Sequence, residues 1–183
     1  MNESQGWTIW LTGLPASGKT TLARAIQARL RQYGIVAALL DSDTMRTILS
    51  PTSDYSAGGR AAFYRQLTDL TAHLTADGVN VIIAATANRR SYRQRAREQL
   101  HPFTEVWVRC ALDVCRARDP KHLYQRADSG MIRDLPGVDA PYEPPEAPDL
   151  VVDTDQQTPE AAADAVIAGI PRLRHLLLEQ FDS

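Results

Sequence analysis

The stretch "GLPASGKTT", residues 13–21, decides the fold. It follows the apolar run "WTIWLT" and precedes "LARAIQARL", so it lies where a strand is expected to turn into a helix. It fits the pattern G-x-x-x-x-G-K-[ST], in which successive backbone N–H groups form a concavity at the positive end of a helix dipole. Such a concavity binds an anion. We therefore predict a phosphate loop here, in preference to an ordinary glycine-rich turn followed by a surface lysine.

The side chains of this loop predict a metal-bound triphosphate. Lys19 is placed to reach the β- and γ-phosphates, and the Thr20 hydroxyl is placed to bind a Mg²⁺ ion that bridges them. The predicted phosphate-binding residues are Gly13, Leu14, Pro15, Ala16, Ser17, Gly18, Lys19, Thr20 and Thr21.

Composition indicates one compact domain spanning residues 1–183. The chain has 183 residues, 44% of them hydrophobic, which suffices for one sizeable core. Its net charge of −2 argues against a broad nucleic-acid surface. The sequence has neither an apolar run of about 18 residues nor a secretory signal pattern, so we expect a cytoplasmic protein without membrane contact. Cys110 and Cys115 lack metal-site spacing and are expected to be buried free thiols.

Strand-like and helical segments alternate along the chain. The expected strands are Thr8–Thr12, Val36–Leu40, Val79–Ala85, Glu105–Cys110 and Leu150–Asp153, and the expected helices are about 19–33, 60–77, 91–100 and 159–179. This alternation predicts an α/β fold, with a central parallel sheet that has helices on both faces. Site residues are then expected at the carboxyl edge of the sheet. Pro171 is expected to kink or split the last helix.

The segment "DLPGVDAPYEPPEAPD", residues 134–149, is rich in proline and acidic residues. Neither a regular helix nor a central strand tolerates this composition. A loop of this length within a compact domain is more often functional than a surface excursion, although both remain open.

A second constellation is "LLDSDTMR", residues 39–46. Asp41 and Asp43 end an apolar strand two residues apart, so the strand period aims both carboxylates to the same side of the sheet edge. Phosphoryl transfer requires a carboxylate near the metal ion or the attacking hydroxyl. We assign Asp43 as the catalytic base, with Asp41 as the alternative base or as a partner of Mg²⁺. The structural alternative is a helix cap, for which "SDT" is suitable.

Four segments together resemble the adenylylsulfate kinase (APS kinase) family of P-loop kinases. They are "IWLTGLPASGKTTLA" (9–23), "LLDSDTMR" (39–46), "RDPKHLYQRA" (118–127) and "GVDAPYEPPEAPDLVVDT" (137–154). The resemblance implies a P-loop NTPase fold and the transfer of a phosphoryl group from ATP, with Mg²⁺, to the 3′-hydroxyl of adenosine 5′-phosphosulfate. The product is 3′-phosphoadenosine 5′-phosphosulfate (PAPS), which serves sulfate assimilation or secondary metabolism. The resemblance also allows a homodimer.

The resemblance implies roles for individual residues. Lys19 and Asp43 are the catalytic pair, and Arg118 joins the phosphate loop in binding ATP within a lid of about residues 118–148. Thr20 and Asp41 are assigned to the metal. The residues assigned to the acceptor are Asp43, Arg46, Tyr55, Arg60, Phe63, Ala87, Lys121 and Leu135. Arg90 and Arg93 are expected to be the inward-facing members of the cluster "RRSYRQRAR".

Several of these positions depart from the family pattern. Phe63 stands where the family has an asparagine, Ala87 where it has a serine that has been proposed as a phosphorylated residue in some members, and Leu135 where it has a second adenine-stacking phenylalanine. Because the departures concentrate at the acceptor, the sequence also allows a related kinase that acts on another nucleoside, sugar or antibiotic hydroxyl. A nucleotide-binding regulator without catalysis is a further alternative.

Overall fold

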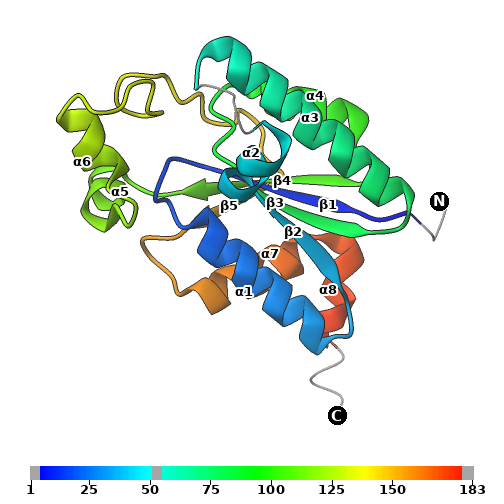
Figure 1. The fold of residues 1–183 in the computed structure, drawn as a ribbon. Helices are drawn as coiled ribbons and strands as arrows, with labels where there is room; N and C mark the ends of the chain where they lie inside the picture. Colours follow the sequence, from blue (N-terminus) through cyan, green and yellow to red (C-terminus); the bar gives the residue numbers. More distant parts are fainter. Residues whose placement is uncertain (1–4, 51–54, 179–183) are drawn as a thin grey trace.

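The computed structural model describes residues 5–50 and 55–178, and these form one parallel β-sheet with helices on both faces (Figure 1). The strand order is β2-β3-β1-β4-β5, and all neighbouring strands pair in parallel. The strands are β1 (Thr8–Thr12), β2 (Ala37–Asp41), β3 (Asn80–Ala84), β4 (Phe103–Arg109) and β5 (Leu150–Asp153). The predicted α/β class is therefore confirmed.

The helices divide between the two faces of the sheet. They are α1 (Lys19–Gln32), α2 (Ser42–Leu49), α3 (Ala57–Ala76), α4 (Arg90–Gln99), α5 (Leu112–Arg118), α6 (Leu123–Asp128), α7 (Pro159–Gly169) and α8 (Pro171–Leu178). Helices α1, α7 and α8 cover one face, and α3 and α4 cover the other (Figure 1). Strand β1 is buried throughout: Ile9 and Leu11 belong to the first core, and Trp10 belongs to the second.

The functional edge of the sheet is where the strands end. The phosphate loop follows β1, helix α2 follows β2, and α5, α6 and the loop to residue 149 stand off the sheet beyond β4 (Figure 1). The loop of residues 134–149 is irregular, as predicted, but it is internally bonded. The Asp139 carboxylate accepts the backbone N–H groups of Asp134 and Leu135 at 2.8 and 2.6 Å.

Most expected elements are found within a few residues of their predicted ends. The last helix is split at Pro171 into α7 and α8, as expected, and residue 179 of that prediction lies outside the described part. Helices α2, α5 and α6 were not predicted. Cys110 and Cys115 are buried free thiols, as expected. Among the described residues, no helix is both long and apolar enough to span a bilayer.

Candidate active site

Two kinds of constraint shape the phosphate loop: close packing at one glycine, and a left-handed backbone conformation at two other residues. A Cβ atom on Gly13 would lie 2.4 Å from the carbonyl oxygen of Val108, so only glycine fits between β1 and β4. Ala16 and Gly18 have φ values of 59° and 93°. Left-handed residues in such a turn make successive backbone N–H groups converge, which produces an anion-binding concavity at the start of α1.

Lys19 lies within this concavity. Its ammonium group donates to the carbonyl oxygens of Gly13 and Leu14 at 3.0 and 2.6 Å. Burial lowers the pKa of Lys19 to about 8, although the carboxylates of Asp43 and Asp41 partly oppose that effect. Lys19 is thus a buried cation whose charge is only partly offset by its neighbours, and this favours the binding of an anion.

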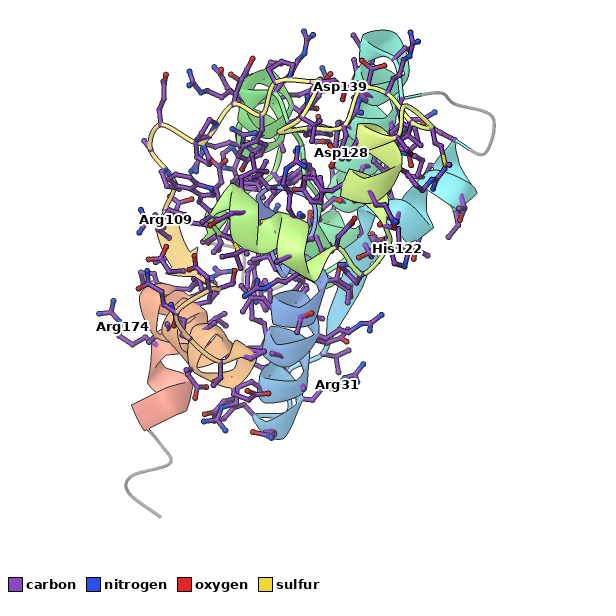
Figure 2. All side chains as sticks on the ribbon, turned by 90° about the vertical axis from the view of Figure 1, so that its left-hand side faces the viewer. Arg31, Arg109, His122, Asp128, Asp139 and Arg174 are labelled. Carbon is purple, nitrogen blue, oxygen red and sulfur yellow. The ribbon has the colours of Figure 1, made fainter. Side chains whose placement is uncertain are left out.

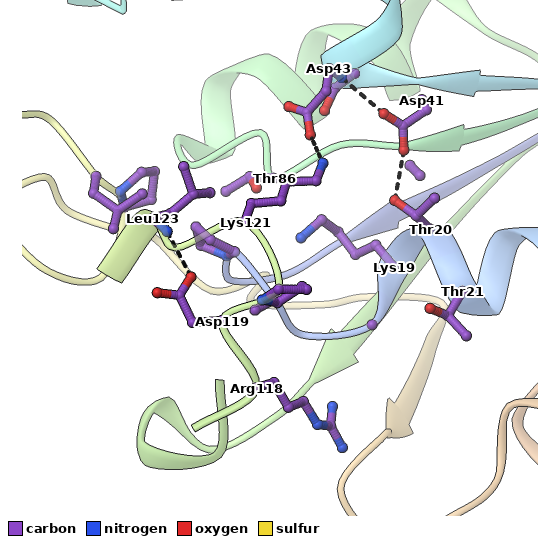
Figure 3. Close-up of a pocket in the computed structure, with 18 of the residues that line it drawn as sticks. Lys19, Thr20, Thr21, Asp41, Asp43, Thr86, Arg118, Asp119, Lys121 and Leu123 are labelled. Atoms are coloured by element: carbon purple, nitrogen blue, oxygen red, sulfur yellow. Dashed lines mark hydrogen bonds and ion pairs between the residues drawn. The ribbon is translucent and has the colours of Figure 1, made fainter. Parts of the chain in front are cut away.

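Asp41 links the phosphate loop to the next strand. Its Oδ2 accepts a hydrogen bond from the Thr20 hydroxyl at 2.6 Å, and its Oδ1 accepts one from the backbone N–H of Asp43 at 3.0 Å (Figure 3). Asp41 is the N-cap of α2, so the cap lies one residue before the "SDT" (42–44) that the sequence suggested for this role. One carboxylate therefore fixes Thr20 and the position of Asp43 together.

Asp43 faces a lysine from across the cleft. Lys121, in the turn between α5 and α6, donates to the Asp43 carboxylate, and the two meet near the end of Lys19 (Figure 3). This hydrogen bond raises the pKa of Lys121. The turn is fixed by Asp119, whose two oxygens accept the N–H groups of Leu123 and Gln125 at 2.7 and 3.1 Å.

The residue after Lys121 adopts a left-handed conformation. His122 has a φ of 53°, a region that side-chain-bearing residues seldom occupy. Figure 2, which views the molecule from the side of α5 and α6, shows His122 on the face of these helices turned toward α2. Glycine adopts this conformation without steric cost, so His122 carries backbone strain that a glycine would not.

Two arginines and a tyrosine form the next part of the wall. The Arg46 guanidinium lies over the rings of Tyr55 and Phe63, at 4.7 and 4.1 Å from the ring centroids. Arg60 lies over Tyr55 at 5.3 Å, and it donates to the carbonyl oxygens of Tyr55 and Asp134. Both arginines are nearly buried, with exposures of 9% and 8%. Neighbouring groups therefore hold both guanidinium groups in place, whereas arginines on a solvent-exposed helix face would be free to move.

These groups border one cleft of about 1140 Å³. Of the residues assigned from sequence, its lining includes Pro15, Ala16, Gly18, Lys19, Thr20, Thr21, Asp41, Asp43, Arg46, Tyr55, Arg60, Arg118, Lys121 and Leu135. Gly13, Leu14 and Ser17 shape the phosphate loop behind this lining. The structure thus brings most of the predicted site into one place.

Two predicted acceptor residues lie behind the cleft instead. Phe63 and Ala87 are completely buried. Phe63 packs under Arg46, and the Ala87 backbone N–H donates to the Tyr64 hydroxyl at 2.8 Å. Neither side chain reaches the cleft surface. The prediction that Phe63 and Ala87 contact the acceptor is therefore wrong, and both residues support the wall of the cleft from behind.

Arg90 and Arg93 were expected to face inward. This prediction is wrong for Arg90, whereas Arg93 is buried as expected but does not face the cleft. Arg90 is half exposed, and it pairs with Glu146 and the carbonyl oxygen of Pro144. Arg93 is buried, but it donates to Glu105 at 2.8 Å and to the carbonyl oxygens of Ala87 and Glu143. Both arginines hold the proline-rich segment against the sheet, outside the cleft.

The segment of residues 118–148 is tied to the body of the protein at the phosphate-loop end of the cleft. The Tyr124 hydroxyl donates to the carbonyl oxygen of Pro15 at 2.9 Å, and Arg118 donates to that of Thr154 at 2.7 Å. A small apolar core of Cys110, Cys115, Tyr124 and Leu135 lies beneath. This segment therefore forms one wall of the cleft.

Sequence reasoning missed some cleft residues. Arg24, Arg133, Thr154 and Gln157 also line the cleft. Arg24 lies one helical turn after Thr20 on α1, so the helical period could have placed it beside the phosphate loop. Thr154 follows β5, and its hydroxyl donates to the carbonyl oxygen of Ser17 at 2.7 Å. Because Thr154 directly follows a predicted strand, its position at the carboxyl edge of the sheet could have identified it as a cleft residue.

The sequence matches the adenylylsulphate kinase family over residues 5–153. It is 38% identical to "Adenylyl-sulfate kinase" of Synechococcus sp. (strain JA-3-3Ab), over 91% of this chain and 94% of that relative. It is 39% identical to "Probable adenylyl-sulfate kinase" of Pyrococcus abyssi (strain GE5 / Orsay), over 94% of this chain and 99% of that relative.

Comparison with solved structures points to the same family. The Mycobacterium tuberculosis APS kinase CysC, in complex with AMPPNP and APS, superposes with a TM-score of 0.86 at 34% identity, covering 90% of this chain and 97% of that one. A gluconokinase of Sinorhizobium meliloti 1021, at 21% identity and a TM-score of 0.60, shares the fold. The phosphate loop, the paired aspartates and the match over most of the chain lead to one conclusion: this protein belongs to the adenylylsulphate kinase family of P-loop kinases.

Proposed function

We propose that this enzyme transfers the γ-phosphoryl group of ATP to the 3′-hydroxyl of adenosine 5′-phosphosulfate and so produces PAPS. The observation that carries the proposal is that one cleft holds both a phosphate loop and Asp43, which is linked to that loop through Asp41 and Thr20. The M. tuberculosis relative, whose structure contains AMPPNP and APS, supports the same pair of substrates.

The donor is assigned to the phosphate-loop end. Backbone N–H groups of the phosphate loop and the ammonium group of Lys19 bind the triphosphate. Arg118 and Thr154 border the same end and are assigned to the nucleoside. Since Lys19 is already bonded to two loop carbonyl oxygens, it is held in place before ATP arrives.

Thr20 and Asp41 fit a Mg²⁺ ion. A hydroxyl and a carboxylate 2.6 Å apart offer oxygen donors, and Mg²⁺ is commonly bound by one or two carboxylates, with phosphate oxygens and water completing its octahedron. The described residues contain no group of three or more His, Cys, Asp or Glu that could hold a metal ion alone. When bound, the ion would neutralise charge on the β- and γ-phosphates.

The acceptor is assigned to the end formed by α2 and the segment of residues 118–148. Arg46 and Arg60 face its phosphosulfate, and Tyr55, with 52% of its surface exposed, offers a ring to the adenine. Leu135 contributes an apolar wall. We assign the 118–148 segment as a lid, and exclusion of water beneath it strengthens these charge interactions.

In the reaction, the 3′-oxygen forms a bond to the γ-phosphorus, and the bond from this phosphorus to the oxygen that bridges to the β-phosphorus breaks. The proton of the 3′-hydroxyl passes to the Asp43 carboxylate, and ADP leaves with the bridging oxygen. Asp43 is suited to this role because its backbone is fixed by Asp41. Lys19 stabilises the charge on the transferred group.

We extend the proposal to a cytoplasmic enzyme that forms a homodimer, for which the support is the family resemblance. Light scattering of the purified protein measures this directly. A solution mass twice that of one chain supports the dimer, and a mass equal to one chain rejects it.

The proposed function is tested by supplying ATP, Mg²⁺ and adenosine 5′-phosphosulfate and measuring PAPS by chromatography. A set of other alcohols, including nucleosides and sugars, serves as the control. Saturable turnover that depends on adenosine 5′-phosphosulfate supports the proposal. Turnover with another alcohol alone contradicts the acceptor, and absence of turnover with every alcohol contradicts catalysis.

A further inference from the structure

Phe63 has no place in the mechanism above, yet it contacts a residue that does. Its ring is completely buried in α3, and its centroid lies 4.1 Å from the Arg46 guanidinium carbon. This distance is within the range of a cation–π interaction, which is stronger when both partners are removed from water. Arg46 is itself only 9% exposed, so this contact is largely desolvated.

The ring of Phe63 is fixed from behind. It meets Tyr64 edge-on, with centroids 5.2 Å apart, and Tyr64 stacks on Tyr92 at 4.8 Å. The Tyr64 hydroxyl accepts the backbone N–H of Ala87 at 2.8 Å, which ties these stacked aromatic rings to the segment that follows β3. Phe63 is therefore a rigid surface, whereas Tyr55, the other ring under Arg46, is half exposed.

Arg46 is also coupled to the catalytic side of the cleft. It lies three residues after Asp43 on α2, and residues three apart share a helix face. Because the Phe63 ring lies directly against the Arg46 guanidinium, it restricts the positions that this group can take and so the directions in which its N–H groups can point.

We propose that Phe63 is a positioning residue, whose buried ring orients the Arg46 guanidinium and so sets the affinity for the charged group of the acceptor. The proposal rests on the proposed function, which assigns the acceptor to Arg46. It also accounts for an aromatic residue at a position where the family pattern has asparagine. Phe63 would act through Arg46 and would not touch the acceptor.

The test compares Phe63→Leu, which keeps an apolar side chain but removes the π-system, with the wild-type enzyme. We expect the KM for adenosine 5′-phosphosulfate to rise about three- to tenfold, with kcat and the KM for ATP unchanged. The matched control is Phe103→Leu, since the Arg97 guanidinium lies over the Phe103 ring at 5.2 Å, at the start of β4 and far from the strand ends that form the cleft. This control should leave both KM values unchanged.

A double-mutant cycle separates positioning from packing. In an Arg46→Met background, Phe63→Leu should raise the acceptor KM no further. If it raises the KM by the same factor with and without Arg46, or if kcat falls with an unchanged acceptor KM, Phe63 acts by supporting α2 and the proposal is overturned. Should Phe63→Leu fail to fold by circular dichroism, Phe63→Met replaces it, with the same expected result.

A second readout does not depend on the acceptor. A proton above a ring face resonates upfield, so the Nε–Hε signal of Arg46, assigned by its loss in Arg46→Lys, should move downfield in Phe63→Leu but not in Phe103→Leu. An unmoved signal overturns the proposal even if the enzyme turns over. If wild-type enzyme does not use adenosine 5′-phosphosulfate, the proposed function fails, and this signal still decides whether Phe63 positions Arg46.

Discussion

Tyr124 donates its hydroxyl hydrogen to the carbonyl oxygen of Pro15 at 2.9 Å, and this bond joins α6 to the phosphate loop. Tyr124 is 2% exposed, and it packs with the two cysteines and Leu135. The wall of the cleft is thus attached to the phosphate loop.

Tyr124→Phe should therefore destabilise the protein. Removal of the hydroxyl leaves a buried carbonyl oxygen without its donor, which costs about 1 kcal/mol and lowers Tm by about 2–4 °C. Tyr33→Phe is the matched control, because among the described residues the buried Tyr33 hydroxyl has no hydrogen-bond partner. Differential scanning calorimetry should show an unchanged or higher Tm for this control. Equal losses in both variants would contradict the assigned bond.

Lys19 predicts a pH dependence of ATP binding. Its pKa in the empty site is about 8, and a bound triphosphate favours the protonated form and raises that pKa. Above pH 8, binding must therefore take up a proton, and the affinity for ATP should fall, by at most about tenfold per pH unit. Lys19→Arg is the control, because arginine stays charged and its binding should vary less with pH. Calorimetry in two buffers of different ionisation enthalpy measures the proton uptake, and proton release or a constant affinity would refute the assignment.

The buried ion pair behind the cleft predicts a large effect on stability. In Arg93→Met, Glu105 and two backbone carbonyl oxygens lose a buried donor, and we expect a loss of about 3 kcal/mol in the free energy of unfolding. Arg95→Met on the same helix removes an exposed pair with Asp69, at 3.8 Å, and should change stability by less than about 1 kcal/mol. Urea unfolding with linear extrapolation compares the two variants. Similar values for both would show that the buried network contributes little.

The sequence was sufficient for the sheet and the phosphate loop because both follow from local patterns. Apolar runs marked the strands, and the spacing of Gly13, Gly18 and Lys19 marked the loop. Helices α2, α5 and α6 have six to eight residues each, too short to show a clear helical period. For α2, the sequence did suggest a helix cap, but it placed the cap at residues 42–44, whereas the observed cap is Asp41.

The site was less predictable where burial decides a residue's role. Arg90, Arg93 and Phe63 are of types found in nucleotide sites, and sequence alone does not show whether such a residue faces a cleft or a core. The carbonyl oxygens of Ala87 and Glu143 that hold Arg93 come from segments 56 residues apart, and no local pattern reveals that pairing. The family resemblance placed Arg46, Lys121 and Leu135 at the cleft, where local patterns alone did not.

The central claim is that Asp43 directs the acceptor hydroxyl toward a phosphoryl group held by the phosphate loop. Asp43 also pairs with Lys121, so two roles must be separated: catalysis, and attachment of the 118–148 segment. Lys121→Met removes the ion pair and leaves the carboxylate, whereas Asp43→Asn removes the charge from both roles.

The decisive measurement is kcat for PAPS formation by Asp43→Asn, with ATP affinity determined on the same sample and Lys121→Met as the comparison. We predict that kcat falls by about 10²–10⁴-fold in Asp43→Asn, that ATP still binds, and that Lys121→Met retains far more of the wild-type kcat. A kcat of Asp43→Asn equal to that of the wild type, or no lower than that of Lys121→Met, would contradict the account.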